Sequence, residues 1–316
     1  MKLSIIIPVY NVEAYVESCI MSCVNQDIPL NQYEIIIIND GSTDASLEVV
    51  QRLSEKYSNI KVYSHDNQGL SLTRNTGLEL ASGTYIWFVD SDDSIEDKCL
   101  SSLLEEASGV DMLAFGCKDY EDGNLVGEFR YGTDSRLTGC EFMVETTTCF
   151  MHGAPFYLFR REFMLNCNLK FYPGIYHEDT ELIPKALLEA GVVKISKGSW
   201  YHRNIRSGSI TRSINPKRAY DLLFVAERLS AYISAKQLPK SVRKSFLLLL
   251  PIIMNNSLNI ISTCPDGEVK RFNSVFANKK LFKYYLASRN LRYVIEGIAL
   301  FLFRKHPVAF YRMIKK

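Results

Sequence analysis

Short apolar runs and amphipathic segments alternate along the first hundred residues. The runs LSIIIP, YEIIIIN, IKVYSH and TYIWFVD are rich in Ile, Val and aromatic residues, which predicts four strands. The segments between them, residues 12–26, 43–57 and 70–81, place apolar residues at helical spacing. Because the strand runs lack a polar alternation, we expect both faces of the sheet to be covered by helices. The predicted fold is therefore α/β, with a Rossmann-like, mainly parallel sheet flanked by helices.

The pattern loosens after residue 110 and becomes purely helical after Pro216. Between these points we expect strands at 110–117, 125–132 and 192–203, and helices at 139–147, 161–167 and 178–191. Residues 217–316 resemble a series of helices rich in Leu, Ile, Phe and Tyr. We therefore predict a first domain at 1–212, with a nucleotide-binding half at about 1–100 and an acceptor half at about 101–212, and a helical C-terminal region at 213–316.

Composition narrows the class of protein only slightly. The 316 residues carry a formal net charge of +2, which gives no reason to expect a nucleic-acid partner. Eight scattered Cys without a CxxC pair are typical of a reducing, cytoplasmic compartment. No leader peptide is expected at the N-terminus, and the apolar stretches 246–254 and 293–303 are too short to predict a membrane span.

Carboxylates gather where two predicted strands end. Asp40 follows the second strand, and Asp90, Asp92 and Asp93 follow the fourth. In an open parallel sheet these strand ends line one crevice, where ligands bind. Structural alternatives stay open for both groups of acids. Asp40 could be a turn residue or a helix cap, since NDGSTD is good turn chemistry, and one Asp of DSDD could cap the next helix.

Crowded carboxylates repel one another, so three of them at one strand end need a reason. They can bind a hard divalent cation through oxygen, or divide acid and base roles as in glycoside hydrolysis. A cation removes the repulsion, and Mg²⁺ or Mn²⁺ bridges readily to phosphate oxygens. We therefore expect a divalent metal, Mn²⁺ or Mg²⁺, as cofactor.

Four segments in order resemble the motifs of family 2 glycosyltransferases, which have the GT-A fold. They are SIIIPVYN, IIIINDGSTD, NQGLSLTRNTGLELASGTYIWFVDSDD and, later, HEDTEL. The resemblance covers about residues 3–200, is closest over 3–100, and does not extend to 217–316. Each motif alone is weak, whereas four in the right order and spacing are a strong signal.

The resemblance implies where a nucleotide-sugar donor binds. Asp40 would accept a hydrogen bond from the base, usually uracil, and the wall beside the base would be formed by Pro8, Val9 and Tyr10. Arg74 would face the diphosphate; the alternative is a solvated charge on a helix.

The resemblance also implies a metal motif. Asp90, Ser91 and Asp92 match the Asp-any-Asp motif of the family, which holds the ribose and a divalent metal bound to the diphosphate. Asp93 is an additional acid, and either Asp92 or Asp93 could be the metal ligand.

A second acidic pair resembles the catalytic part of the family. Glu178-Asp179 matches the later acidic motif, in which the Asp is the general base that takes the proton of the acceptor hydroxyl. The alternative is that both residues only favour a helix N-terminus. Three further candidates carry less weight: His202 and Arg203, in a segment that the family often uses near the diphosphate, and His152, in a stretch that departs from the family pattern.

Together these features predict an inverting, metal-dependent glycosyltransferase that moves a sugar from a nucleotide donor, expected to be UDP-linked, to a saccharide or lipid-linked saccharide in cell-surface polysaccharide biosynthesis. The C-terminal helices would allow peripheral contact with the inner face of the cell membrane; the alternative is an ordinary helical subdomain with a solvated basic end. One alternative is a nucleotidyltransferase, but the loop PVYNVEAY lacks the Gly and Lys that a triphosphate loop needs. Another is a non-catalytic nucleotide-sugar-binding module, against which DSDD and Glu178-Asp179 both argue.

Overall fold

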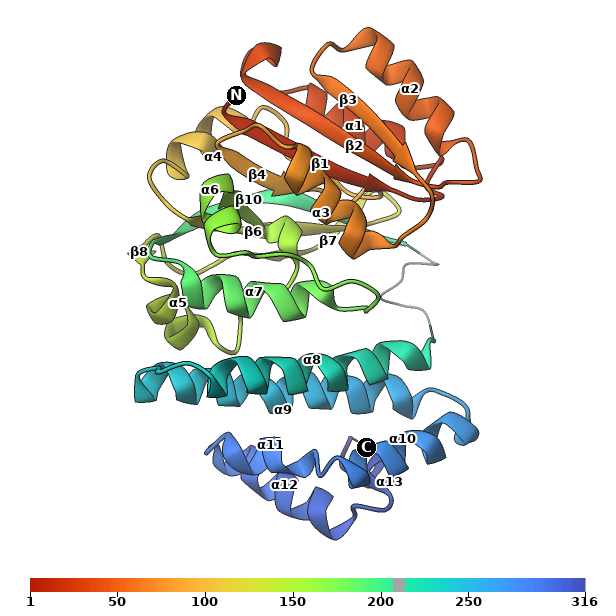
Figure 1. Cartoon of the computed structure of the whole chain (residues 1–316), viewed down its shortest axis with the longest axis vertical. Coiled ribbons are helices and arrows are strands. Elements are labelled where there is room, and N and C mark those ends of the chain that lie inside the picture. The colour runs from red at the N-terminus through yellow and green to blue at the C-terminus, as the bar shows by residue number, and fades with distance from the viewer. Residues whose placement is uncertain (207–213, 316) are drawn as a thin grey trace. The chain divides into compact units, whose positions relative to one another are not determined.

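The structure is a computed structural model that describes residues 1–206 and 214–315. These residues form two compact units (Figure 1). Unit 1 comprises Met1–Gly139, Met151–Gly174 and Ala186–Ser209, and unit 2 comprises Cys140–Phe150, Ile175–Lys185 and Ile210–Lys316. The predicted domain limit at 212 lies outside the described residues and stays a prediction.

The first hundred residues alternate strands and helices, as predicted. The elements are β1 (Leu3–Val9), α1 (Val16–Val24), η1 (Leu30–Gln32), β2 (Tyr33–Asp40), α2 (Ser46–Lys56), β3 (Ile60–His65), α3 (Leu70–Leu80), β4 (Tyr85–Phe88) and β5 (Ser94–Ile95). Every residue of β1, β2 and β4 is buried. This burial explains why these strands lack a polar alternation.

The middle of the chain also matches the predicted elements. It contains α4 (Leu100–Glu106), β6 (Met112–Glu121), β7 (Asn124–Phe129), β8 (Arg136–Leu137), α5 (Gly139–Thr146), η2 (Ala154–Phe156), β9 (Tyr157–Arg160), α6 (Arg161–Asn166), α7 (Glu178–Glu189) and β10 (Val193–Ile205). The additional strands β5, β8 and β9 are short, and two of them have only two residues. Runs of this length carry too little periodicity to be recognised in a sequence.

One sheet forms the centre of unit 1. Its strand order is β3-β2-β1-β4-β9-β6-β10-β5, with β7 paired to β6 and β8 paired to β10. Strands β3, β2, β1 and β4 are parallel, as predicted, whereas β9, β7, β5 and β8 pair antiparallel with their neighbours. The parallel part is the nucleotide-binding type of sheet, and helices α1, α2 and α3 lie along it (Figure 1).

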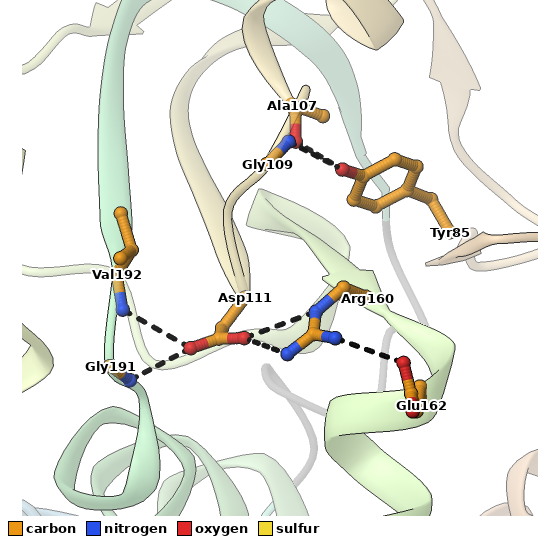
Figure 2. A network of polar contacts seen from close by, with 8 residues as sticks. All are labelled: Tyr85, Ala107, Gly109, Asp111, Arg160, Glu162, Gly191 and Val192. Carbon is orange, nitrogen blue, oxygen red and sulfur yellow. Dashed lines mark hydrogen bonds and ion pairs between the residues drawn. The ribbon is translucent and has the colours of Figure 1, made fainter.

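A polar network joins the residues just before β6 and β10 to the last residue of β9. Asp111, just before β6, accepts hydrogen bonds from the backbone N–H groups of Gly191 and Val192 at 2.8 and 3.1 Å. Its other oxygen takes the guanidinium of Arg160, which also pairs with Glu162 (Figure 2). Because one carboxylate joins three separate chain segments, the network holds β6, β9 and β10 in register.

The rest of the chain is helical, as predicted. It contains α8 (Pro216–Ser234), α9 (Lys240–Ser262), α10 (Asp266–Asn278), α11 (Phe282–Ala287), α12 (Leu291–Leu302) and α13 (Pro307–Ile314). Helices α8 and α9 pack together, and the Ser257 hydroxyl of α9 donates to the Ala219 carbonyl of α8 at 2.7 Å. The Tyr285 hydroxyl of α11 donates to the Asn255 side chain of α9 at 2.7 Å, so α11 is fixed to the same core.

Helix α9 is longer than its apolar run suggested. By length and composition, its 23 residues are sufficient to cross a membrane, unlike the nine-residue stretch that the sequence analysis considered. Half of its most apolar window is buried inside the protein, including Phe246, Leu250 and Ile253. Core helices of soluble proteins pass the same test, so one such helix is weak support for a membrane span.

Candidate active site

The carboxyl ends of β1, β2 and β4 meet at one edge of the sheet in unit 1. Val9 of β1 lies opposite Asn39 of β2, and Ile6 lies opposite Phe88 of β4. The loops that follow these strands therefore begin side by side. They carry the residues from Tyr10 onward, those from Gly41 onward, and Asp90 to Asp93.

Asp40 is held by the loop that leads into α3. One carboxylate oxygen accepts the backbone N–H of Gln68 at 2.8 Å, and the other accepts that of Gly69 at 2.9 Å. The Nδ1 atom of His65 lies 3.3 Å from the first oxygen. Gly41 follows with φ of 69°, and a Cβ there would lie 2.8 Å from the backbone nitrogen of Asn67. Asp40 is thus a buried acceptor that binds the backbone just before α3, and its contact with a nucleobase stays a prediction.

The loop after β1 is tied to the loop after β2. The Asn11 side chain accepts the Thr43 N–H at 2.8 Å, and the Asn11 N–H donates to the Ser42 hydroxyl at 3.1 Å. Pro8 and Val9 are buried in the strand, whereas Tyr10 is 49% exposed. Tyr10 is therefore the member of the predicted wall that is free to contact a planar ligand.

Arg74 is buried beside the fourth strand end. Its side chain is 1% exposed and donates to Asp90 at 2.6 Å, with the guanidinium 5.1 Å from the centre of the Phe171 ring. The alternative of a solvated helix charge is therefore wrong. Asp90 keeps 34% of its side chain exposed, so it faces solvent while Arg74 holds it from behind.

Asp92 is the second partly exposed carboxylate, and Arg206 pairs with it. The Nε and Nη2 atoms of Arg206 lie 2.9 and 2.7 Å from Asp92 Oδ2, and the guanidinium lies 4.7 Å from the centre of the Tyr15 ring. Burial raises the pKa of Asp92, the charge of Asp90 raises it further, and Arg206 opposes the shift.

Asp93 is buried and bound by strand β10. One oxygen accepts the Asn204 N–H at 2.7 Å and the other accepts the Tyr201 hydroxyl at 2.6 Å. Burial, followed by the charges of Asp90 and Asp92, raises the pKa of Asp93 well above its ordinary value. The same Tyr201 oxygen accepts the Asp90 N–H at 3.2 Å. Tyr201 is fully buried and therefore holds two acids of the DSDD loop in place.

Two of the three carboxylates, those of Asp90 and Asp92, are partly exposed, whereas Asp93 is buried. Among residues 1–206 and 214–315, no cluster of three or more His, Cys, Asp or Glu side chains has metal-binding geometry. Mg²⁺ needs only one or two protein carboxylates when phosphate and water supply the other oxygens. Asp90 and Asp92 are exposed enough to serve, and the mutual repulsion that raises the pKa of Asp92 is what a cation relieves.

His202 and Arg203 pair with acids outside the DSDD loop, Glu96 and Asp119. His202 Nε2 lies 3.0 Å from Glu96, which also binds Lys118. Burial alone would raise the pKa of Glu96, but hydrogen bonds from Lys118 and His202 lower it. Arg203 makes two hydrogen bonds to Asp119 at 2.9 and 2.8 Å.

The three remaining predicted residues belong to other parts of the chain than the strand ends. Burial lowers the pKa of His152 to about 4, so this imidazole is neutral at pH 7. Glu178 and Asp179 belong to unit 2, where they begin α7; Glu178 is buried and Asp179 is half-buried. One turn later, Glu181 Oε1 binds Arg228 of α8 at 2.7 Å, which fixes the helix that carries them.

By resemblance, the segment with Tyr201, Asn204 and Arg206 was expected near the diphosphate, but sequence reasoning gave these three residues no role. Tyr201 and Asn204 bind Asp93, and Arg206 binds Asp92, yet all three lie more than 100 residues further along the chain. The strand signal at 192–203 was visible, but nothing in the sequence gave its register against the DSDD loop. Only the pairing of β10 with β6 and β5 sets that register.

Known proteins share both the sequence motifs and the fold. The family model for glycosyl transferase family 2 matches residues 4–175. An uncharacterized glycosyltransferase, EpsJ of Bacillus subtilis, is 35% identical over 63% of this chain and 60% of its own length. The GalNAc(5)-diNAcBac-PP-undecaprenol beta-1,3-glucosyltransferase of Campylobacter jejuni is 31% identical over 69% of this chain and 70% of its own. This chain thus spans about 60% of the length of EpsJ.

Solved structures give the same fold at low identity. S. aureus TarS 1-349 in complex with UDP-GlcNAc superposes with a TM-score of 0.75 at 21% identity, covering 99% of this chain and 92% of TarS 1-349. A mannosyltransferase from Pyrobaculum calidifontis, solved with GDP-Man and Mn²⁺, reaches 0.58 at 15% identity over 96% and 88% of the two chains. The matching family model covers more than half of the sequence, and the chain belongs to glycosyl transferase family 2.

Proposed function

We propose that this chain is an inverting glycosyltransferase that moves a sugar from a UDP-linked donor to a saccharide acceptor. The observation that carries the proposal is the sheet edge of unit 1. There, a fixed acceptor (Asp40), an exposed ring (Tyr10) and two partly exposed carboxylates (Asp90 and Asp92) follow neighbouring parallel strands. Nucleotide ligands bind at this edge in open α/β sheets.

Asp40 is assigned to the nucleobase. Each of its oxygens accepts one backbone N–H and retains a second lone pair, so it can also accept an N–H from the edge of uracil. Tyr10 provides a ring against which the base can stack, with Pro8 and Val9 behind it. These are the residues that would distinguish UDP from a simple diphosphate.

Asp90 and Asp92 are assigned to a divalent cation, with Ser91 between them in contact with the nucleotide sugar. When bound, Mn²⁺ or Mg²⁺ would neutralise the charge that develops on the leaving diphosphate. Arg74 holds Asp90 from the protein side, and Arg206 is placed to turn from Asp92 toward phosphate oxygens. We assign Asp93 to positioning, because Tyr201 and Asn204 already bind its two oxygens.

Asp179 is assigned as the general base. Inverting transfer is one displacement at the anomeric carbon, and the acceptor hydroxyl must lose its proton as it attacks. Asp179 is half-buried in the first turn of α7, where the helix N-terminus favours negative charge. Glu178, His152, His202 and Arg203 stay secondary candidates; the partners of the last two, Glu96 and Asp119, favour structural roles.

For the acceptor we propose a lipid-linked saccharide in cell-surface polysaccharide biosynthesis, handled at the cytoplasmic face of the membrane. The name of the Campylobacter jejuni relative describes transfer to an undecaprenol-linked saccharide. That relative matches this chain over 70% of its own length, which supports an acceptor of the same chemical class.

A donor panel without acceptor tests the donor half of the reaction, because water then takes the sugar and the nucleotide is released. The purified chain is incubated with UDP-glucose, UDP-galactose, UDP-GlcNAc, UDP-GalNAc and GDP-mannose, each with Mn²⁺ or with EDTA, and the released nucleotide is measured. We expect UDP release from at least one donor, in the presence of Mn²⁺ only. Release of GDP alone would refute the uridine assignment, and equal release in EDTA would refute the metal assignment.

A further inference from the structure

We infer that α12 and α13 form a docking surface for an anionic lipid membrane. The inference deepens the membrane location proposed above, but it depends only on unit 2 and not on the transfer reaction. Its starting point is an apolar stripe on α12 that faces solvent. The stripe consists of Leu291, Ile295, Ile298 and Leu302, which are 76%, 58%, 50% and 68% exposed.

The four side chains of the stripe lie on one face of the helix and are not scattered around it. They follow one another by four, three and four residues, which places them above one another on an α-helix. The opposite face of α12 packs on α11. A Cβ at Gly297 would lie 2.7 Å from the Cβ of Tyr285, and Leu300 is buried. Because the close approach at Gly297 fixes the rotation of α12, the stripe is directed away from α11.

More large apolar side chains are exposed at the end of α12, just after it and on α13. Phe301 and Phe303 are 44% and 45% exposed, and Met313 and Ile314 of α13 are 62% and 49% exposed. A groove of about 790 Å³ lies beside the stripe, with Asn255, Glu296 and Phe310 among its lining residues. Soluble proteins rarely expose contiguous apolar surface on this scale unless it binds something.

The charge of this part of the chain selects the partner. Residues 279–316 contain ten Lys and Arg and one Glu, a formal charge of +9. The preceding 278 residues contain 27 Lys and Arg and 34 Asp and Glu, a formal charge of −7. The overall charge of +2 therefore conceals a strong asymmetry, with the excess of cations placed where the apolar stripe is exposed.

The positions of these cations suit a lipid surface. Arg292, Arg304, Lys305, Arg312 and Lys315 are exposed on or next to α12 and α13. The single acid, Glu296, is neutralised by Arg292 at 3.2 Å. An apolar helix face flanked by cations binds in the headgroup region of anionic bilayers, through apolar burial and charge together. If a second copy of this chain bound through the same surface, two segments of formal charge +9 would face each other. Their repulsion disfavours self-association through this surface.

The test measures binding of the full chain to vesicles by flotation, without donor or acceptor. We expect binding to phosphatidylcholine vesicles that contain phosphatidylglycerol, much weaker binding to phosphatidylcholine alone, and loss of binding in about 0.5 M NaCl. Ile298→Glu with Leu302→Glu should lower the partition coefficient about tenfold or more. The matched control, Leu125→Glu with Val126→Glu on β7, places the same charges on side chains that are 56% and 54% exposed and should bind normally.

A second pair of variants separates charge from apolar contact. The double variant Arg304→Glu with Lys305→Glu should lose the preference for anionic lipid. The control, Lys56→Glu with Lys197→Glu, makes the same charge change on exposed side chains of unit 1. We expect this control to bind anionic vesicles more strongly than the Arg304 and Lys305 variant. Failure of the wild-type chain to bind either vesicle would overturn the inference. Equal binding by the Arg304 and Lys305 variant and by its control would also overturn it. The same holds for a dimer, seen in sedimentation velocity, that Ile298→Glu with Leu302→Glu dissociates. UDP release in solution without vesicles tests the reaction separately, so the two proposals can fail independently.

Discussion

At the scale of single residues, the DSDD loop divides three identical side chains into different roles. Asp93 is buried and doubly hydrogen-bonded, Asp90 pairs with Arg74, and Asp92 pairs with Arg206. The sequence showed that three acids follow a strand but could not rank them, because their differences come from β10 and from Arg206, far along the chain. Burial and partners, not residue type, determine which acid can hold a metal.

This division predicts opposite effects of two substitutions. Asp92→Asn should abolish the advantage of Mn²⁺ over EDTA in UDP binding, measured by calorimetry, with little change in melting temperature. Tyr201→Phe should keep that advantage but lower the free energy of unfolding by about 1–3 kcal/mol, because buried Asp93 and the Asp90 N–H each lose a partner. Asp97→Asn, on an exposed acid nearby in sequence, is the control and should change neither quantity.

The pKa of Asp92 adds a pH dependence to the same experiment. A carboxyl whose pKa is raised in the folded state contributes stability below its ordinary value of 3.8, and that contribution is lost as pH rises through the raised value. A cation binds the ionised form, so affinity for UDP with Mn²⁺ should increase with pH through the same window. Asp92→Asn should remove this increase; an unchanged pH profile in Asp92→Asn would contradict the metal assignment.

At the scale of elements, the periodicity of the sequence predicted the positions of helices and strands. It did not predict where the backbone of one element packs closely against another. The segment LTRNTG was predicted as helical, and α3 confirms it. The reason for Gly77 within it became visible only in three dimensions, because a Cβ there would lie 2.3 Å from Cγ2 of Ile6 in β1. Hydrophobic patterning shows which face of a helix is buried; it does not show how near the opposing strand lies.

The contact at Gly77 therefore predicts that Gly77→Ala changes the free energy of unfolding in the opposite direction from helix propensity. In an exposed helix, Gly→Ala stabilises by about 1 kcal/mol. Gly77→Ala should instead destabilise unit 1 by about 1–3 kcal/mol, because β1 or α3 must shift to admit the methyl group. Gly267→Ala, in α10 with no atom within 4 Å of the added Cβ, is the matched control and should be neutral or stabilising. Denaturant unfolding measures both, and equal stabilisation by the two substitutions would contradict the packing argument.

At the scale of the whole molecule, the sequence predicted two contiguous regions. It did not predict that the compact units are built from non-contiguous segments. The short segments Cys140–Phe150 and Ile175–Lys185 group with the C-terminal helices, although they lie between parts of unit 1 in the sequence. Unit assignment depends on contacts between residues distant in sequence, such as Glu181 with Arg228, which leave no periodic signal. The proposed donor-binding residues belong to unit 1, whereas the proposed base, Asp179, belongs to unit 2.

That split predicts a separation of catalysis from binding. Asp179→Asn keeps the shape and polarity of the side chain but cannot accept a proton at neutral pH. We expect transfer to fall about 10²-fold or more. UDP and Mn²⁺ binding should remain near wild type, because their proposed ligands all belong to unit 1. Helix α7 should stay in place through Glu181 and Arg228, so the melting temperature should barely change.

The neighbouring acids supply the comparison that makes this result decisive. Glu178→Gln removes the preceding carboxylate from the same helix turn and should reduce transfer much less. Glu145→Gln, on an exposed side chain of unit 2, should have no effect on transfer. Single-turnover rates with saturating donor separate the chemical step from product release. Near-normal turnover in Asp179→Asn would return Asp179 to a helix-start role, and a large loss in Glu178→Gln instead would transfer the assignment of general base to Glu178.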